Sequence, residues 1–148
     1  MDLILWRHAE AEDSAPDHAR VLTAKGIKQA GKVAAFLQQH LPDDCRILVS
    51  PATRTQQTVA PLSGKFTLAP TIAPGASAEA VLQAARWPDA GGTVLIVGHQ
   101  PTLGEVAAQL LGRANSSLSI KKGALWWFSQ RDGSAQTTLR LVITPDFL

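Results

Sequence analysis

Three short stretches of the chain are apolar without alternating polar positions. They are Leu3–Trp6, Ile47–Val49 and Val94–Val97. Such runs are typical of strands buried on both faces, as in a parallel sheet with helices on each side. Ile120–Phe128 and Thr137–Ile143 predict two more strands, because the segment between them contains Asp132-Gly133, a pair that favours a turn. Phe66–Ala69 is expected to add an edge strand.

The segments between these runs show the 3.6-residue spacing of apolar positions that predicts amphipathic helices. Thr23 is expected to cap the first helix, since its hydroxyl can accept a hydrogen bond from a backbone N–H of the first turn. The apolar face of this helix is Ile27, Ala30, Val33, Ala34 and Leu37. Ser50 and Pro51 predict the start of a second helix, as its cap and first residue. This helix should end near Ala60, because Pro61 cannot continue it.

Two more helices are predicted in the middle of the chain. Ser77 is expected to cap one that continues to Ala85 and stops before Pro88. The other is expected to end at Gly112. Its apolar stripe is Leu103, Val106, Ala107, Leu110 and Leu111. The order of strands and helices predicts a three-layer α/β/α sandwich with a mostly parallel central sheet and right-handed crossovers. We expect residues 1–148 to form a single domain of this kind.

The composition excludes several classes of protein. The chain has 45% hydrophobic residues and a net charge of only +2, which argues against disorder. Cys45 is the only cysteine, so neither an intrachain disulfide scaffold nor a cysteine-rich zinc site is available. The basic residues form no stripe, so no nucleic-acid partner is expected. The first residues lack the features of a signal peptide and no apolar run approaches about 20 residues, so we expect a cytoplasmic protein without membrane contact.

Residues with chemical function follow the ends of the three buried runs. Arg7 and His8 follow the first, Arg54 follows the second and His99 follows the third. Each alone is more often an ordinary loop or surface residue, but ligands in open α/β sheets bind beyond the carboxyl ends of the strands. Two guanidinium groups, two imidazoles and the starts of two following helices together predict a pocket for a dianionic phosphoryl group.

These residues, in this order, resemble the histidine phosphatase superfamily. The matching segments are Arg7-His8-Ala9, Ser50-Pro51-x-x-Arg54-x-x-Gln57-Thr58 and Gly98-His99-x-Pro101. The short length and the segment from Asp17 to Gly26, which contains Arg20, Leu22 and Thr23, are similar to the compact SixA-like phosphohistidine phosphatases. Val21 departs from that family, which often has proline there. The resemblance implies a phosphoglycerate mutase-like fold without a helical cap insertion, and therefore an open pocket.

The resemblance also implies a mechanism. His8 would attack phosphorus with one ring nitrogen and form a phosphohistidine intermediate, while a backbone carbonyl would hold its other N–H. Arg7, Arg54 and His99 would hold the three equatorial oxygens without a metal or any other cofactor. Arg20, in a loop beside the first strand end, is expected to bind or guide the substrate phosphate. A plain surface charge at the entry to the helix is an equally good interpretation of Arg20.

The general acid is the least defined part of the predicted site. Glu79 is the best-placed candidate, but we favour the interpretation that it only starts a helix, where a carboxylate interacts well with the dipole. Glu10, Glu12, Asp13 and Asp17 lie in the first loop and could also approach the site. A phosphoramidate needs less help from an acid, because its P–N bond is labile, so a missing acid favours phosphohistidine as the substrate.

Three functions are compatible with the sequence. The first is a protein-phosphohistidine phosphatase whose partner is a phosphorylated histidine-containing protein, either a phosphotransfer domain or a sugar-uptake carrier. The second is a phosphatase of small phosphomonoesters from the same superfamily. The third is a module that binds phosphate or a phosphoprotein and turns it over poorly. For Trp126-Trp127-Phe128, a core strand is favoured over a strip that docks another protein.

Overall fold

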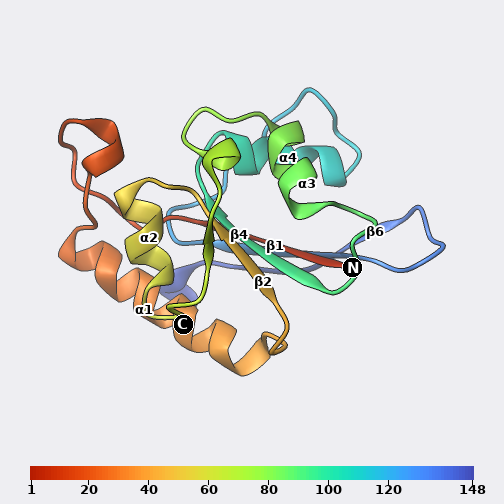
Figure 1. Cartoon of the computed structure of the whole chain (residues 1–148), viewed down its shortest axis with the longest axis horizontal. Helices are drawn as coiled ribbons and strands as arrows, with labels where there is room; N and C mark the ends of the chain where they lie inside the picture. Colours follow the sequence, from red (N-terminus) through yellow and green to blue (C-terminus); the bar gives the residue numbers. More distant parts are fainter.

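Six strands form one mixed sheet in the computed structural model, which describes all 148 residues (Figure 1). The strands are β1 (Asp2–Arg7), β2 (Arg46–Val49), β3 (Thr67–Leu68), β4 (Thr93–Gly98), β5 (Leu125–Gln130) and β6 (Thr137–Ile143). Their order across the sheet is β3-β2-β4-β1-β5-β6. The first four strands in this order run parallel, β5 pairs antiparallel with β1, and β6 pairs antiparallel with β5. The mostly parallel sheet predicted from the apolar runs is confirmed, as is the edge position of β3.

Four helices cover the two faces of this sheet. They are α1 (Ala24–His40), α2 (Thr53–Val59), α3 (Ala78–Ala85) and α4 (Thr102–Leu110), with the short 3₁₀ turns η1 (Asp17–Ala19), η2 (Pro70–Ile72) and η3 (Pro145–Phe147). Figure 1 shows α1 and α2 on one side of the sheet and α3 and α4 on the other. Successive side chains of β1 point to opposite faces of the sheet. Ile4 and Trp6 pack with α1, whereas Leu3 and Leu5 pack with α4. The predicted three-layer α/β/α class is therefore confirmed, and no further helix forms a cap.

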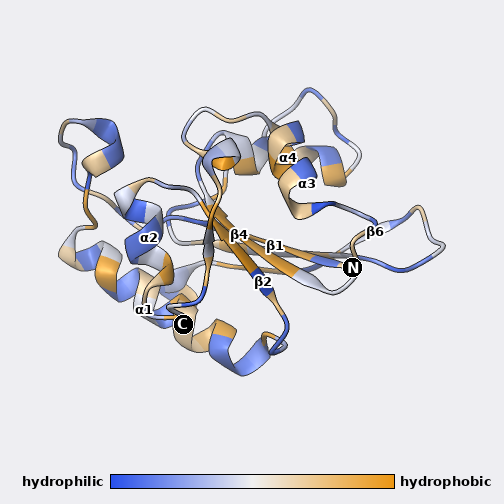
Figure 2. Ribbon diagram, in the orientation of Figure 1, coloured by the Kyte–Doolittle hydropathy of each residue, from blue (hydrophilic) through white to orange (hydrophobic).

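The most hydrophobic residues concentrate on the central strands (Figure 2). Trp6 and Phe128 are fully buried, and Trp127 is almost so, which agrees with the core interpretation of the aromatic segment. Burial of large apolar side chains on both faces of β1 and β4 is the main force that holds the layers together. No helix has the length and apolar character that are needed to cross a lipid bilayer.

The predicted helix ends agree with the structure in three helices. The Thr23 hydroxyl accepts a hydrogen bond from the Gly26 N–H (3.0 Å), and the Ser77 hydroxyl accepts one from the Ala80 N–H (3.1 Å). Gly112 has a φ of 77° just after α4, as expected for a residue that ends a helix.

The predicted start of α2 is wrong. This helix begins at Thr53, with Ala52 rather than Ser50 at the N-cap. The Ser50 hydroxyl lies 2.7 Å from Nε2 of His99 and accepts a weaker bond from the Ala52 N–H (3.3 Å), so it is used outside the helix.

Two other predictions need correction. Ile27 is predicted on the apolar face of α1, but its side chain is 62% exposed and Gly26 is buried in its place. The strand predicted from Ile120 begins only at Leu125. Ile120 is buried, yet it lies in the loop just before a turn in which Gly123 has a φ of 74°. An apolar residue can fill the core from a loop as well as from a strand, and the apolar pattern does not distinguish the two.

Gly26 is buried because the loop that follows β1 crosses α1 at this residue. A Cβ atom at Gly26 would lie 2.0 Å from the carbonyl oxygen of Glu10, well inside any real contact. The same carbonyl accepts a hydrogen bond from the Thr23 N–H (3.0 Å). The first loop is thereby held against the start of α1 at Glu10, which is two residues after His8.

We expect Gly26→Ala to lower the free energy of unfolding by about 1–3 kcal/mol, because the methyl group displaces the backbone of Glu10. Gly31→Ala in the same helix is the matched control, since a Cβ atom there meets nothing within 4 Å. The control should raise stability by roughly 0.5–1 kcal/mol through helix propensity. Urea titrations of both variants measure the difference, and equal effects would contradict the close approach.

Candidate active site

The pairing of the central strands brings three chain segments together at one edge of the sheet. Arg7 lies opposite Gly98 in the β1–β4 pair, and Val49 lies opposite Val97 in the β2–β4 pair. The next residues along the chain continue this alignment. The N–H of His8 donates to the carbonyl of Gly98 (3.0 Å), and the N–H of Ser50 donates to that of Val97 (3.1 Å). The residues that follow β1, β2 and β4 are thus neighbours.

The two histidines predicted for the site lie side by side. The ring centroids of His8 and His99 are 5.3 Å apart, and the two residues are only 7% and 4% exposed. Arg54 is in the first turn of α2 and is 4% exposed, while Arg7 is half-buried at the end of β1. The four residues predicted from three separate strand ends therefore form one cluster, which we call the cationic cluster.

The imidazole of His8 is neutral and has a defined tautomer. Its Nδ1 lies 2.7 Å from the carbonyl oxygen of Ala9, and a carbonyl can only accept, so Nδ1 carries the proton and Nε2 has a free lone pair. Burial lowers the pKa of His8 to about 4. The nearby charges of Arg54 and Arg7 act in the same direction, while the bond to Ala9 opposes them. At neutral pH, Nε2 is available as a nucleophile.

His99 is also neutral in this environment. Burial lowers its pKa to about 3, and the neighbouring His8 and Arg54 contribute further. Its Nε2 lies 2.7 Å from the Ser50 hydroxyl, which can donate to it. With that arrangement, Nδ1 carries the proton and is free to donate.

Three buried side-chain nitrogen atoms have no hydrogen-bond partner in the protein. They are Nε of Arg7, Nε of Arg54 and Nδ1 of His99. Every other buried side-chain nitrogen or oxygen atom of the chain has a hydrogen-bond partner. Buried polar groups are normally paired, because an unpaired donor costs about 1–3 kcal/mol. That all three belong to the cationic cluster indicates a site for a ligand rich in acceptor atoms.

Asp17 connects Arg54 to the first loop. Arg54 donates through one nitrogen to the Asp17 carbonyl (2.9 Å) and through another to the Asp17 carboxylate (3.2 Å). Arg20 donates to the other carboxylate oxygen (3.3 Å) and through Nε to the carbonyl of Glu12 (2.7 Å). The structure thus places Arg20 beside the cluster, close enough for its charge to contribute to lowering the pKa of His8.

The candidate general acids of the first loop are bound to other groups or exposed. Partial desolvation raises the pKa of Asp17, but the hydrogen bond from Arg20 and the charge of Arg54 outweigh it, so the pKa lies below its usual value and the carboxyl is ionised. The Glu10 carboxylate accepts from the Thr23 hydroxyl (2.8 Å), and Glu12 and Asp13 are exposed.

Glu79 is exposed in the first turn of α3. It borders surface cavities with residues of α3 and α4, and neither cavity includes a member of the cationic cluster. Its position agrees with the simple helix-start interpretation.

Two supporting residues were not assigned to the site from the sequence, although Ser50 was expected to cap a helix. Ser50 holds His99 through its hydroxyl group. The Thr58 hydroxyl accepts from the N–H of Ala9 (3.0 Å) and donates to the carbonyl of Arg54 (2.7 Å), which joins α2 to the residue after His8. Both residues are polar positions within the segment that carries the family resemblance, and this was the available signal.

The site has no constellation suited to a metal ion. No three His, Cys, Asp or Glu side chains of the chain lie close enough together to hold one. The chemistry of the cluster is instead that of hydrogen-bond donors and positive charge, which suits a phosphoryl or similar oxyanion.

We expect the stability of the protein to fall as the pH is lowered from about 6.5 to about 4. In this range the unfolded chain binds protons at His8 and His99 that the native state, with both pKa values lowered, does not bind. The free energy of unfolding should decrease by at most about 1.4 kcal/mol per pH unit for each histidine. Urea unfolding of the protein and of the His8→Gln/His99→Gln variant measures this, and equal slopes would argue against the depressed pKa values.

The sequence matches one family model. The model describes the histidine phosphatase superfamily (branch 1), and it matches residues 3–77. A phosphohistidine phosphatase SixA homolog from Haemophilus influenzae is 37% identical over 131 residues, which covers 78% of this chain and 80% of the relative.

Solved structures agree with this match. The structure of a putative SixA from Nakamurella multipartitia has a TM-score of 0.79 and 31% identity, and the match covers 97% of this chain and 95% of that one. The structure of SixA in complex with tungstate has a TM-score of 0.83 and 25% identity, with 99% of each chain covered. The chain therefore belongs to the histidine phosphatase superfamily, and within it the chain is similar to the SixA phosphohistidine phosphatases.

Proposed function

We propose that this protein is a metal-independent protein-phosphohistidine phosphatase. The observation that carries the proposal is the cationic cluster itself, in which a neutral imidazole with a free Nε2 lies beside three buried, unpaired N–H donors. Its similarity to a SixA homolog supports the choice of substrate. Tungstate, which is bound in a related SixA structure, is a tetrahedral oxyanion like the phosphoryl group.

The phosphoryl oxygens bind to Arg7, Arg54 and His99. The guanidinium groups supply fixed positive charge, and Nδ1 of His99 donates a hydrogen bond when the Ser50 hydroxyl donates to its Nε2. The dianion raises the pKa of His99 and favours the imidazolium form. Phosphoryl transfer depends mainly on positioning and on neutralising the charge of the transferred group, so these residues can supply most of the catalysis.

In the first step, the lone pair of His8 Nε2 forms a bond to phosphorus as the P–N bond of the substrate breaks. The leaving nitrogen keeps the electron pair of that bond, and the substrate leaves as a neutral imidazole if its other ring nitrogen carries a proton. His8 now has phosphorus on Nε2 and hydrogen on Nδ1, so its ring is cationic. The carbonyl of Ala9 stabilises that charge through the bond to Nδ1.

In the second step, water attacks phosphorus and the Nε2–P bond breaks. The electron pair returns to Nε2, which restores the neutral imidazole of His8, and the attacking water loses a proton to the phosphate or to solvent. The products are inorganic phosphate and the unmodified histidine of the substrate protein.

The lack of a suitable general acid supports phosphohistidine over phosphate esters as the substrate. An alkoxide leaving group needs a proton from the enzyme, whereas an imidazole does not. Asp17 is ionised and bound to two arginines, so we assign it to positioning Arg54 and Arg20 rather than to proton transfer. Arg20, on the exposed side of the cluster, would contact the incoming phosphohistidine.

We expect His8→Ala to reduce hydrolysis of a phosphorylated histidine phosphotransfer domain by at least about 10³-fold, because the nucleophile is lost. His40→Ala is the control, since His40 is an exposed histidine at the end of α1. Release of labelled phosphate measures the rates. Quenching the wild-type reaction with alkaline detergent should trap phosphate on His8 that is stable to base and labile to acid, and a chelator should leave the rate unchanged. Full activity of His8→Ala, or loss of activity with chelator, contradicts the mechanism.

We also expect a steep dependence of the rate on the leaving group. Phosphoramidate and a phosphohistidine protein should be hydrolysed at least about 10²-fold more efficiently, by kcat/KM, than sugar phosphates, because no acid protonates an alkoxide. Efficient turnover of sugar phosphates would instead support a small-molecule phosphomonoesterase. Tight binding of phosphate or tungstate without any hydrolysis would support a binding module.

A further inference from the structure

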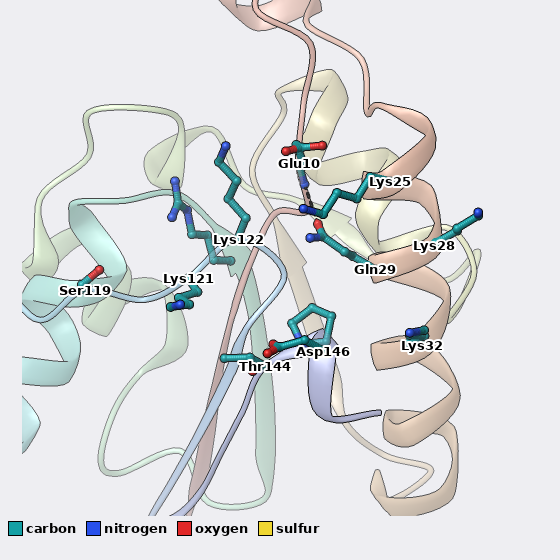
Figure 3. A pocket seen from close by; sticks show the side chains of 12 residues that line it. Glu10, Lys25, Lys28, Gln29, Lys32, Ser119, Lys121, Lys122, Thr144 and Asp146 are labelled. Atoms are coloured by element: carbon teal, nitrogen blue, oxygen red, sulfur yellow. Dashed lines mark hydrogen bonds between the residues drawn. The ribbon is translucent and has the colours of Figure 1, made fainter.

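A basic groove runs beside the cationic cluster. It has a volume of about 730 Å³ and is lined by side chains from α1, from the turn before β5 and from the region of η3. Figure 3 shows Lys25, Lys28 and Lys32 along one wall and Lys121 and Lys122 on the other. None of the residues that line it is hydrophobic. We call it the lysine groove.

The lysine groove contains most of the lysines of the protein. The chain has six lysines, and five of them line this one cavity; Lys65 is the exception. With Arg7, six cations face two carboxylates, those of Glu10 and Asp146, which gives the lining a net charge of +4. The whole chain has a net charge of only +2, so the remainder of the molecule is net negative. The positive charge is therefore concentrated at this groove.

The side chains of the groove lysines have no bonded partner within the protein. None of them takes part in an ion pair or a side-chain hydrogen bond, and all five are exposed. The two carboxylates of the lining neutralise the lysines only in part, because six cations face two carboxylates. The Glu10 carboxylate accepts a hydrogen bond from the Thr23 hydroxyl rather than from a lysine. Hydrogen bonds from Thr144 and from its own backbone hold the pKa of Asp146 below its usual value, and the charges of Lys121 and Lys32 add to this. The groove is an unpaired positive surface.

The groove is attached directly to the active site. Arg7 lines the groove, and one of its terminal nitrogens donates to the carbonyl of Ile120 (2.8 Å), next to Lys121. The N–H of Gly123 donates to the carbonyl of His8 (3.0 Å). The turn that carries Lys121 and Lys122 is thus fixed by hydrogen bonds to the two residues that begin the cationic cluster. A ligand that presents a phosphoryl group to His8 lies beside this groove.

The composition of the groove and the length of its lysine row fit a protein surface better than a small molecule. Pockets for small molecules are mostly apolar, with a few polar groups. Here every lining residue except Pro145 is charged or polar, and Lys25, Lys28 and Lys32 extend over two turns of α1, about 10 Å at 1.5 Å per residue. A row of cations of this length can face several carboxylates of a partner at once.

We propose that the lysine groove docks an acidic surface of the phosphorylated protein substrate, adjacent to its phosphohistidine. This inference rests on the proposed function and assigns the substrate protein a chemical character. Opposite charge on the two surfaces accelerates their association and sets their orientation, and salt weakens both effects. The groove should therefore act on KM and on its salt dependence rather than on the chemical step.

The test compares a groove variant with a matched control on two substrates. The groove variant is Lys25→Gln/Lys28→Gln/Lys32→Gln, and the control is Lys65→Gln, an exposed lysine elsewhere. At low salt we expect the groove variant to lose at least about 10-fold in kcat/KM, mainly through KM, toward a phosphorylated histidine phosphotransfer domain with an acidic surface. Its kcat/KM toward phosphoramidate, which is too small to reach the groove, should change less than about 2-fold. The difference should shrink at high salt.

A binding measurement separates this proposal from the proposed function. A fluorescent glutamate-rich peptide should bind the wild-type protein and Lys65→Gln equally, and the groove variant at least about 10-fold more weakly, by fluorescence anisotropy. Unchanged binding and unchanged kcat/KM in the groove variant would overturn the docking proposal. Equal losses toward both substrates would also overturn it, because they indicate damage to the cationic cluster. Absence of phosphatase activity in the wild type would reject the proposed function, and the peptide binding would still decide whether the groove binds acidic chains.

Discussion

Burial of unpaired hydrogen-bond donors is the constraint on which this structure depends. Arg7, Arg54 and His99 each hold one buried N–H away from any protein acceptor, at a cost in stability that the rest of the fold must offset. The same burial lowers the pKa of the two histidines, so that His8 remains neutral among positive charges. One physical effect thus accounts for both the unpaired donors and the neutral imidazole that the proposed mechanism uses.

Backbone hydrogen bonds and small contacts hold these groups in place. Parallel pairing aligns the ends of β1, β2 and β4, and polar side chains then fix the residues just beyond each strand. Ser50 contacts His99, Thr58 joins Ala9 to α2, and Asp17 binds Arg54. Rigid support of this kind is needed for phosphoryl transfer, because its catalysis depends mainly on position and charge.

The distribution of charge suggests two levels of recognition. The buried cationic cluster is suited to the phosphoryl group, whereas the exposed lysine groove beside it is suited to the protein that carries that group. The two differ in their expected response to salt, since buried interactions are screened much less than exposed ones. Arg7 belongs to both and connects them.

The apolar runs alone predicted the mostly parallel sheet, because strands buried on both faces must be apolar at every position. The rule that ligands bind at the carboxyl ends of strands then predicted Arg7, His8, Arg54 and His99 as one site. Predictions from the local sequence pattern were wrong where a residue contacts a segment that is distant along the chain. Ser50 looked like a helix cap but contacts His99, and Gly26 is buried only because the Glu10 carbonyl crosses it. The gathering of five lysines around one groove was likewise decided by tertiary structure, since their positions along the chain give no sign that α1 and the turn before β5 face each other.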